Sequence, residues 1–277
     1  MTDLTTPAEA WTAVADAWET HVDYVDEHSE VATKDLLARI DLQPGDRVLE
    51  LASGPGTLGA SLSTLVGPEG TVVLSDLAPG MVAAARRRTA SLANVTVAEI
   101  DASAIDRPDH SFDAVACRMG LQFTSDPSVA LAEIVRVLAP GGRIGALTWG
   151  GLEHNPWLTC VGMAGMLNGL VTGGPPVGPG TVFGLSDPAQ LEALAKGAGL
   201  VDVQVKEIDT LFRVSDIDTH VARVSSLAGG ALAQGFANAT AEQLAGARAT
   251  AAQLAEPHQT EVGYAIPGRL LLLSAHV

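Results

Sequence analysis

The chain has 277 residues, of which 47% are apolar and only 4% aromatic, so it can bury a sizeable core built mostly from Ala, Val and Leu. Its 32 acidic and 16 basic side chains give a net charge of −16, which disfavours nucleic acid and membranes as partners by repulsion of phosphate groups. The two cysteines, Cys117 and Cys160, are too few for a disulfide framework, and no Cys/His spacing indicates a metal site. Because Met1–Leu4 begin no basic or long apolar leader, we expect no signal peptide and a cytoplasmic protein.

The first predicted element is helical and runs from Ala8 to about Ile40. Four apolar side chains in it share one face at spacings of seven, four and three residues: Trp11, Trp18, Val22 and Val25. The turn Gln43–Asp46 then leads into the first strand. We therefore expect residues 1–40 to form a helical cap on an α/β core of residues 41–277.

The stretch from Val48 to Gly59 joins an apolar strand to a helical pattern through a glycine loop. Gly54 and Gly56 let the backbone approach a ligand closely, and Gly59 permits tight packing of the helix on the strand. The same Gly-x-Gly-x-x-Gly spacing occurs in dinucleotide sites, so by itself it leaves the ligand open. Glu50, four residues before the first glycine, would repel a pyrophosphate but suits a ligand with an ammonium and a sulfonium group.

Three further strands are predicted, each followed by a charged residue: Thr71–Ser75 with Asp76, Val95–Ile100 with Asp101, and Phe112–Cys117 with Arg118. Asp76 can accept hydrogen bonds from both hydroxyls of a ribose. Asp101 can accept from an adenine amino group while the backbone N–H of Ala102 reaches a ring nitrogen. Arg118 can meet a ligand carboxylate, and a salt-bridged surface role stays open for it.

Strands and helices alternate up to Trp149, which predicts a parallel sheet with helices on both sides. Two segments break the alternation: Gly150–Gly184, which contains a Gly/Pro run, and the Ala-rich, helical Leu211–Pro257. Ligands of open α/β sheets bind beyond the carboxyl ends of the strands. We therefore expect lid insertions at about 150–184 and 211–257 that roof a substrate pocket, with a plain core role for their Met and Leu side chains as the alternative.

In this order the motifs resemble those of class I S-adenosylmethionine-dependent methyltransferases, in the branch similar to quinone-biosynthesis C-methyltransferases and small-molecule methyltransferases. The resemblance covers about Val31 to Trp149 and includes Phe112–Val115 and the Leu-x-Pro-Gly-Gly of Leu138–Gly142. It implies a Rossmann-like, doubly wound, mostly parallel sheet and S-adenosylmethionine as cofactor. It also implies cofactor contacts from Glu50, Ala52, Gly54, Gly56, Asp76, Leu77, Met81, Asp101, Ala102 and Arg118.

Methyl transfer needs a nucleophile held close to the methyl carbon in a dry site, and a general base only if the acceptor must lose a proton. His154, which follows the fifth strand in the expected lid, is the first candidate for that base, ahead of Tyr24, His21 and His28. We expect methylation of O or C on a small, largely apolar metabolite, with a homodimer left open. A non-methylating reaction such as cyclisation and a non-catalytic regulatory role are the alternatives.

Overall fold

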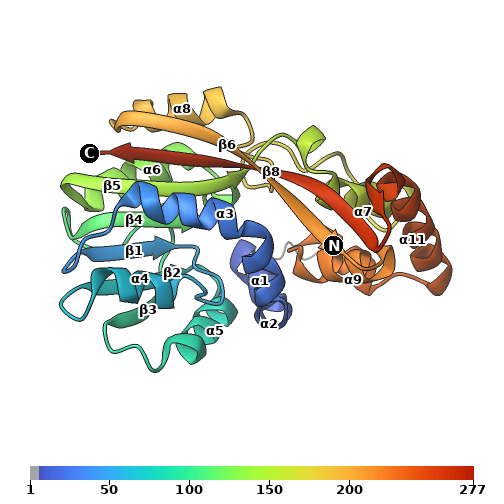
Figure 1. Cartoon of the computed structure of the whole chain (residues 1–277), viewed down its shortest axis with the longest axis horizontal. Coiled ribbons are helices and arrows are strands. Elements are labelled where there is room, and N and C mark those ends of the chain that lie inside the picture. Colours follow the sequence, from blue (N-terminus) through green and yellow to red (C-terminus); the bar gives the residue numbers. More distant parts are fainter. Residues whose placement is uncertain (1–5) are drawn as a thin grey trace.

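The computed structural model describes residues 6–277 and is built on one eight-stranded sheet with the strand order β3-β2-β1-β4-β5-β8-β6 (Figure 1). Strands β1 to β5 are parallel, whereas β8 runs antiparallel to both of its neighbours, β5 and β6. The strands are β1 Arg47–Leu51, β2 Thr71–Asp76, β3 Val95–Glu99, β4 Phe112–Arg118, β5 Leu138–Trp149, β6 Val201–Val214, β7 Gln259–Thr260, which pairs with β8 only, and β8 Gly263–His276. The predicted mostly parallel, Rossmann-like sheet is confirmed.

Helices cover both faces of this sheet (Figure 1). The α-helices are α1 Pro7–Ala13, α2 Ala15–Thr20, α3 Val22–Ile40, α4 Gly59–Val66, α5 Pro79–Thr89, α6 Pro127–Val137, α7 Pro156–Leu167, α8 Pro188–Gly197, α9 Ile217–Leu227, α10 Ala231–Ala237 and α11 Ala241–Ala255. Short 3₁₀ turns lie at Leu121–Phe123, Leu152–His154 and Glu256–His258. Helices α3 and α4 pack on one face with Val48, and α6 and α8 pack on the other with Leu49 and Leu51. Alternation along β1 therefore places Glu50 on the face that carries α3 and α4.

The N-terminal segment is three helices rather than the single predicted one, with breaks at Val14 and His21. The breaks allow α1 and α2 to lie against α5, where the backbone N–H of Gly80 donates to the Thr12 hydroxyl at 3.3 Å. The indole rings of Trp11 and Trp18 meet edge to face at 6.2 Å. Neither break carries a Gly or Pro, so the sequence pattern offered no sign of them. Residues 1–5 of the expected 1–40 cap lie outside the described residues.

Strands β6 and β8 extend beyond the sheet as an antiparallel arm (Figure 1). The pairing of β5 with β8 ends at Trp149 and Leu270, whereas β6 and β8 stay paired as far as Val214 and Tyr264. The arm carries α7 and α9–α11, which share a small hydrophobic core and are called the lid below. One boundary of the expected 211–257 insertion is wrong, because β6 runs to Val214 and the helices begin only at Ile217.

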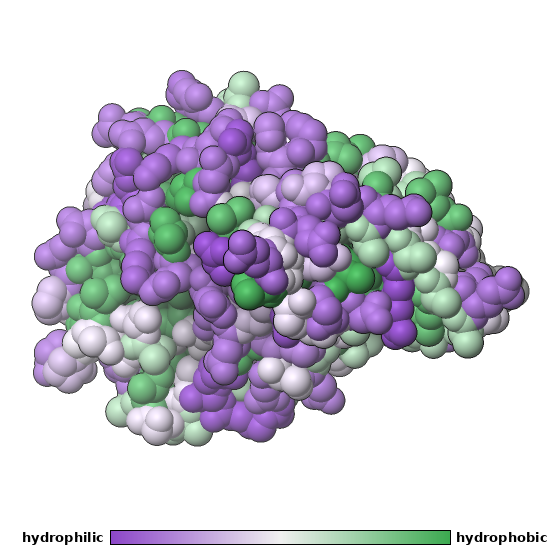
Figure 2. Space-filling view, turned by 45° about the vertical axis from the view of Figure 1, so that its right-hand side comes forward, coloured by the Kyte–Doolittle hydropathy of each residue, from purple (hydrophilic) through white to green (hydrophobic). Residues whose placement is uncertain are grey.

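The surface of the face seen in Figure 2 is mainly hydrophilic, with apolar residues scattered among the polar ones. Among residues 6–277, no helix combines the length and the hydropathy needed to cross a bilayer.

Candidate cofactor and acceptor site

The glycines of the loop after β1 have two different structural roles. Gly54 has φ +54° and an added Cβ there would meet nothing within 4 Å, so this position leaves room for an approaching ligand. Gly56 has φ +78°, and an added Cβ would lie 3.0 Å from the Cβ of Ala85 in α5. Gly59 behaves as expected, because its Cβ would come within 2.9 Å of Leu74. The expectation that Gly56 clears a path for the ligand is therefore incomplete: Gly56 is also needed for packing against α5.

Asp76 ends β2 and closes the loop. Its Oδ2 accepts a hydrogen bond from the backbone N–H of Gly54 and its Oδ1 accepts one from Ala78, both at 2.9 Å. Burial raises the pKa of this carboxyl, and the backbone hydrogen bonds oppose the rise. Each oxygen keeps a further lone pair for a ligand hydroxyl. Beside it, the Leu77 side chain is 39% exposed and offers an apolar surface at the same strand end.

Glu50 is the most unusual group at this edge of the sheet. Its side chain is 1% exposed, and Oε2 has no hydrogen-bond partner among the described residues. Burial raises the pKa of Glu50 to about 8, although the nearby Arg118 opposes the rise. A buried carboxylate oxygen without a donor is unfavourable. The position therefore fits a ligand that brings an ammonium group.

Arg118 ends β4 and is buried, with 9% of its side chain exposed. Its Nη1 lies 2.7 Å from Oδ1 of Asp26 on α3, and its Nη2 donates to the Thr57 hydroxyl of the glycine loop. It thus joins β4, α3 and the loop beside Glu50, rather than forming a surface ion pair. The residues that follow β1 and β4, Ala52 and Met119, both have left-handed backbone, with φ of +50° and +60°. Such strained non-glycine positions are frequent at functional sites.

The remaining predicted cofactor residues divide into two groups. Asp101 and Ala102 follow β3, next to the end of β2, and Asp101 Oδ1 accepts from the backbone N–H of Ser103 at 2.8 Å while its side chain stays exposed. Met81 is instead buried in a cluster with Val14, Ala15 and Ala78 beneath α1 and α2. The structure therefore gives no support for a direct contact between Met81 and a ligand.

The histidines selected from the sequence differ in their surroundings. The His154 side chain is 47% exposed, and its Nε2 lies 3.4 Å from the neighbouring Glu153, as in an ordinary surface pair. Both nitrogens of His28 are used, since Nδ1 donates to the Tyr24 carbonyl at 2.7 Å and Nε2 accepts from the backbone N–H of Arg213 at 2.9 Å. Burial lowers the pKa of His21. No hydrogen bond or ion pair within residues 6–277 joins His154 to Glu50, Asp76 or Arg118.

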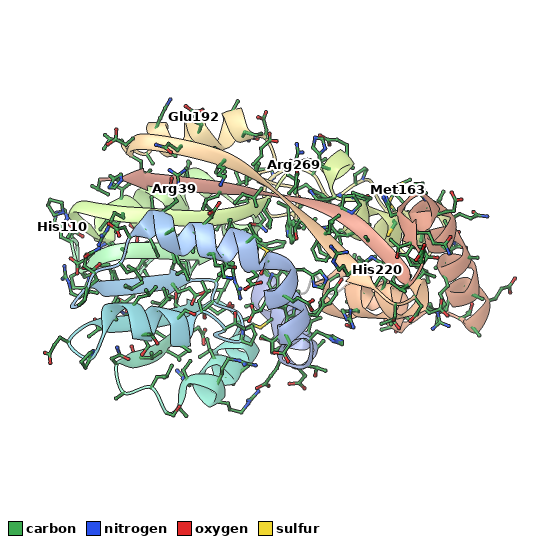
Figure 3. The ribbon with its side chains drawn as sticks, viewed as in Figure 1. Arg39, His110, Met163, Glu192, His220 and Arg269 are labelled. Atoms are coloured by element: carbon green, nitrogen blue, oxygen red, sulfur yellow. The ribbon has the colours of Figure 1, made fainter. Side chains whose placement is uncertain are left out.

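A second set of polar groups, not selected from the sequence, lies where the lid meets α3. His220 on α9 is fully buried, and Figure 3 shows it near the lid, far from His110 at the opposite end of the sheet. Its Nε2 donates to the Trp157 carbonyl at 2.6 Å, and burial lowers its pKa to about 4. Three residues further on, Arg223 places its guanidinium 3.9 Å from the centre of the Tyr24 ring. The sequence signal was the position of His220 and Arg223 among the apolar residues Ile217, Val221 and Val224 of one helix.

Comparison with known proteins agrees with this geometry. Residues 48–142 match the family model of the methyltransferase domain. The ubiquinone/menaquinone biosynthesis C-methyltransferase UbiE of Teredinibacter turnerae is 42% identical over 106 residues, which are 37% of this chain and 43% of that protein. Among solved structures, the YcgJ protein from Bacillus subtilis superposes with a TM-score of 0.59 at 18% identity, over 89% of this chain and 98% of that one. The Haemonchus contortus phosphoethanolamine N-methyltransferase 2, in complex with S-adenosyl-L-methionine, gives 0.55 at 16% identity, over 93% of this chain and 57% of that one.

Residues 48–142 are therefore similar to a methyltransferase domain, and the chain as a whole shares its fold with these solved structures. The match to these curated relatives is partial, because it spans less than half of their length.

Proposed function

We propose that the protein is an S-adenosylmethionine-dependent methyltransferase that acts on O or C of a small, largely apolar metabolite. The unpartnered buried oxygen of Glu50, at the end of β1 beside the glycine loop, is the observation that carries the proposal. A cationic donor satisfies this oxygen when Glu50 is ionised, and the ammonium group of this cofactor is such a donor. The similarity to C-methyltransferases supports the reaction class, and the methyltransferase-domain model matches residues 48–142, which contain this loop.

Each end of the cofactor has a matching group at the carboxyl edge of the sheet. Glu50 accepts from the ammonium group, and Arg118 neutralises the cofactor carboxylate while Asp26 and Thr57 hold it in place. Asp76 accepts from the ribose hydroxyls through the lone pairs that its two backbone donors leave free. The adenine end is assigned to Leu77, Asp101 and Ala102.

The bound sulfonium supplies an activated methyl group, which passes in line to the acceptor nucleophile as the carbon–sulfur bond breaks and leaves a neutral thioether. The protein positions the acceptor and excludes water, since a near-attack arrangement accounts for most of the acceleration that such a reaction needs. Helices α1–α3 and the lid supply this enclosure: the Trp18 indole N–H donates to the Leu227 carbonyl at 2.8 Å and ties them together. The base role of His154 stays a prediction without structural support.

The acceptor is a small molecule in this proposal, because a net charge of −16 disfavours nucleic acid and anionic membranes. A homodimer is compatible with the proposal, and sedimentation at several protein concentrations tests it.

Isothermal titration calorimetry is the direct test. We expect S-adenosylhomocysteine to bind in the micromolar range, about −8 kcal/mol, and NAD to give no heat. Incubation with S-adenosylmethionine and a metabolite mixture, followed by mass spectrometry, should then show a product heavier by one methylene group. Tight NAD binding without S-adenosylhomocysteine binding would overturn the cofactor assignment. Cofactor binding together with a product of unchanged mass would replace methyl transfer by another reaction such as cyclisation.

A further inference from the structure

Arg223 is a half-buried cation without a carboxylate partner in the part of the chain that the structure describes. Its guanidinium lies over the Tyr24 ring at 3.9 Å, and its Nε, which is buried, has no hydrogen-bond acceptor among residues 6–277. No ion pair joins Arg223 to a carboxylate within residues 6–277; on α3, Asp26 pairs with Arg118, and Asp23 and Glu27 are exposed. A cation–π contact stabilises the charge but leaves the N–H without an acceptor. An anionic oxygen would supply the acceptor that this N–H lacks.

Two further polar atoms beside Arg223 are buried and unpartnered in the described part of the chain: the Tyr24 hydroxyl and Nδ1 of His220. Because His220 Nε2 donates to the Trp157 carbonyl, Nδ1 of the neutral ring is an acceptor. The Tyr24 phenol stays protonated, since burial raises its pKa to about 12, and it can donate. Tyr24 and Arg223 thus offer two donors to an anion, and His220 offers an acceptor to a hydroxyl.

Flat apolar rings adjoin these polar groups. Trp157 stacks on Phe212 with centroids 4.1 Å apart and planes inclined by 17°, and Trp149 lies 4.8 Å from Trp157. The Tyr24 ring is 6.1 Å from Phe212, so the polar and the aromatic groups form one cluster. These rings pack on one another, and Phe212 also stacks on His28 with centroids 5.1 Å apart, so they form an apolar aromatic wall beside the polar groups that suits the apolar part of a ligand.

The cluster is continuous with the cofactor residues. Trp149 ends β5 two residues beyond Leu147, which pairs with Arg118 on β4. On α3, Tyr24 lies two residues before Asp26, the partner of Arg118. The same hydrophobic core contains Leu58 from the glycine loop and Met119 from the end of β4. A ligand held by the cluster would therefore lie next to the cofactor.

We infer that the acceptor is a largely apolar compound that carries an anionic oxygen, and that Arg223, Tyr24 and His220 recognise this oxygen and an adjacent hydroxyl from the lid side. The inference rests on the proposed function, because it names the substrate class of the same site. It adds a charge requirement that an apolar acceptor alone would not impose, and it makes Arg223 a specificity-determining residue.

The test compares matched probes in the presence of saturating S-adenosylhomocysteine, with the change in tryptophan fluorescence as readout. The probes are 2-naphthoate, its neutral amide 2-naphthamide, and an acidic nitrophenol that is ionised at the assay pH. We expect at least one of the two anions to bind wild type more than tenfold tighter than the amide. A carboxylate acceptor predicts that naphthoate is preferred, and a phenolic or enolic acceptor predicts that the nitrophenolate is preferred.

Variants assign the preference to the residues. Arg223→Gln should reduce the preference for the anion to less than threefold, Arg223→Lys should retain most of it, and Tyr24→Phe should weaken only the anion, by a few fold. Arg213→Gln, the same charge change at an exposed neighbouring site, should have no effect. Wild type that binds the amide as tightly as both anions, or a folded Arg223→Gln that keeps the preference, would overturn the inference. Because cofactor binding is measured first, failure of S-adenosylhomocysteine to bind would instead count against the proposed function.

Discussion

Cofactor affinity should depend on pH through Glu50. At pH 7 a carboxyl with a pKa of about 8 is ionised in only about a tenth of the molecules, so a ligand that needs the carboxylate loses about 1.4 kcal/mol. We therefore expect the affinity for S-adenosylhomocysteine to rise by about tenfold per pH unit between pH 6 and 7.5. Binding at pH 7 should release about 0.9 proton.

Calorimetry in two buffers of different ionisation enthalpy measures the proton release, and the Glu50→Gln variant assigns it. Glutamine keeps the shape but cannot ionise, so the pH dependence and the proton release should disappear. The affinity deficit of the variant relative to wild type should widen as the pH rises. Glu27→Gln, an exposed carboxylate on α3, is the control and should leave both quantities unchanged.

The same residue should act on stability in the opposite direction. The folded-state pKa of Glu50 is raised from 4.5 to about 8, so the fold favours the protonated form. Its ionisation therefore costs nothing below about pH 4.5, and the cost grows to at most about 5 kcal/mol as the pH rises to 8. The ligand-free Glu50→Gln variant should equal wild type near pH 5 and resist urea better at pH 8. If neither the S-adenosylhomocysteine affinity nor the urea midpoint of the wild-type protein changes with pH, this reasoning is refuted.

Three other substitutions test the site and its support. Asp76→Ala should weaken S-adenosylhomocysteine binding by about 1.5–3 kcal/mol and also lower the urea midpoint, because two backbone N–H groups lose their acceptor; an unchanged dissociation constant would remove Asp76 from the site. Gly56→Val should destabilise the fold itself, since its Cβ would press on Ala85. Gly54→Ala should lower the affinity for S-adenosylhomocysteine, with a stability loss of only about 1–2 kcal/mol. Equal urea midpoints for the two variants would contradict the packing argument. Asn155→Ala should cost about 1–3 kcal/mol of unfolding free energy, because the buried Asn155 Oδ1 accepts a hydrogen bond from the backbone N–H of Arg269 at 3.0 Å and so joins the lid to β8. A cost near zero by urea titration would show that the lid is held by other contacts.

The parallel half of the sheet was predictable because each strand there is a short apolar run that ends in a polar or glycine-rich motif. The starts of two helices also carry clear sequence signals: Asp126 and Asp187 cap α6 and α8, and each is followed by a proline at the first helical position. The three-way division of the N-terminal helix was not predictable, since Val14 and His21 carry no breaking residue. Tertiary contacts of α1 and α2 with α5 accompany those breaks, and local propensity does not encode them.

The candidate cofactor residues could be selected from the sequence, because their positions follow from strand ends that are close in the chain. What sequence spacing did not show is how those residues are satisfied: Asp76 holds the loop, and Arg118 is held by Asp26, 92 positions away. Sequence spacing also did not show that Met81, predicted as a ligand contact, is buried with Val14 and Ala15 of the N-terminal helices.

The acceptor side was missed for a physical reason. Its groups come from α3, β5, β6, α7 and α9, so no motif of fixed spacing brings them together. His154 was the first candidate base because it follows a strand end, but its side chain is about half exposed and lies beside Glu153. His220 has the opposite character: a histidine in an apolar helical stripe suggests a core residue, yet its unpartnered Nδ1 shows that its hydrogen bonding is incomplete. In our proposal, selectivity for the acceptor resides in the arm and lid rather than in the matched region 48–142, apart from what that region contributes through Met119.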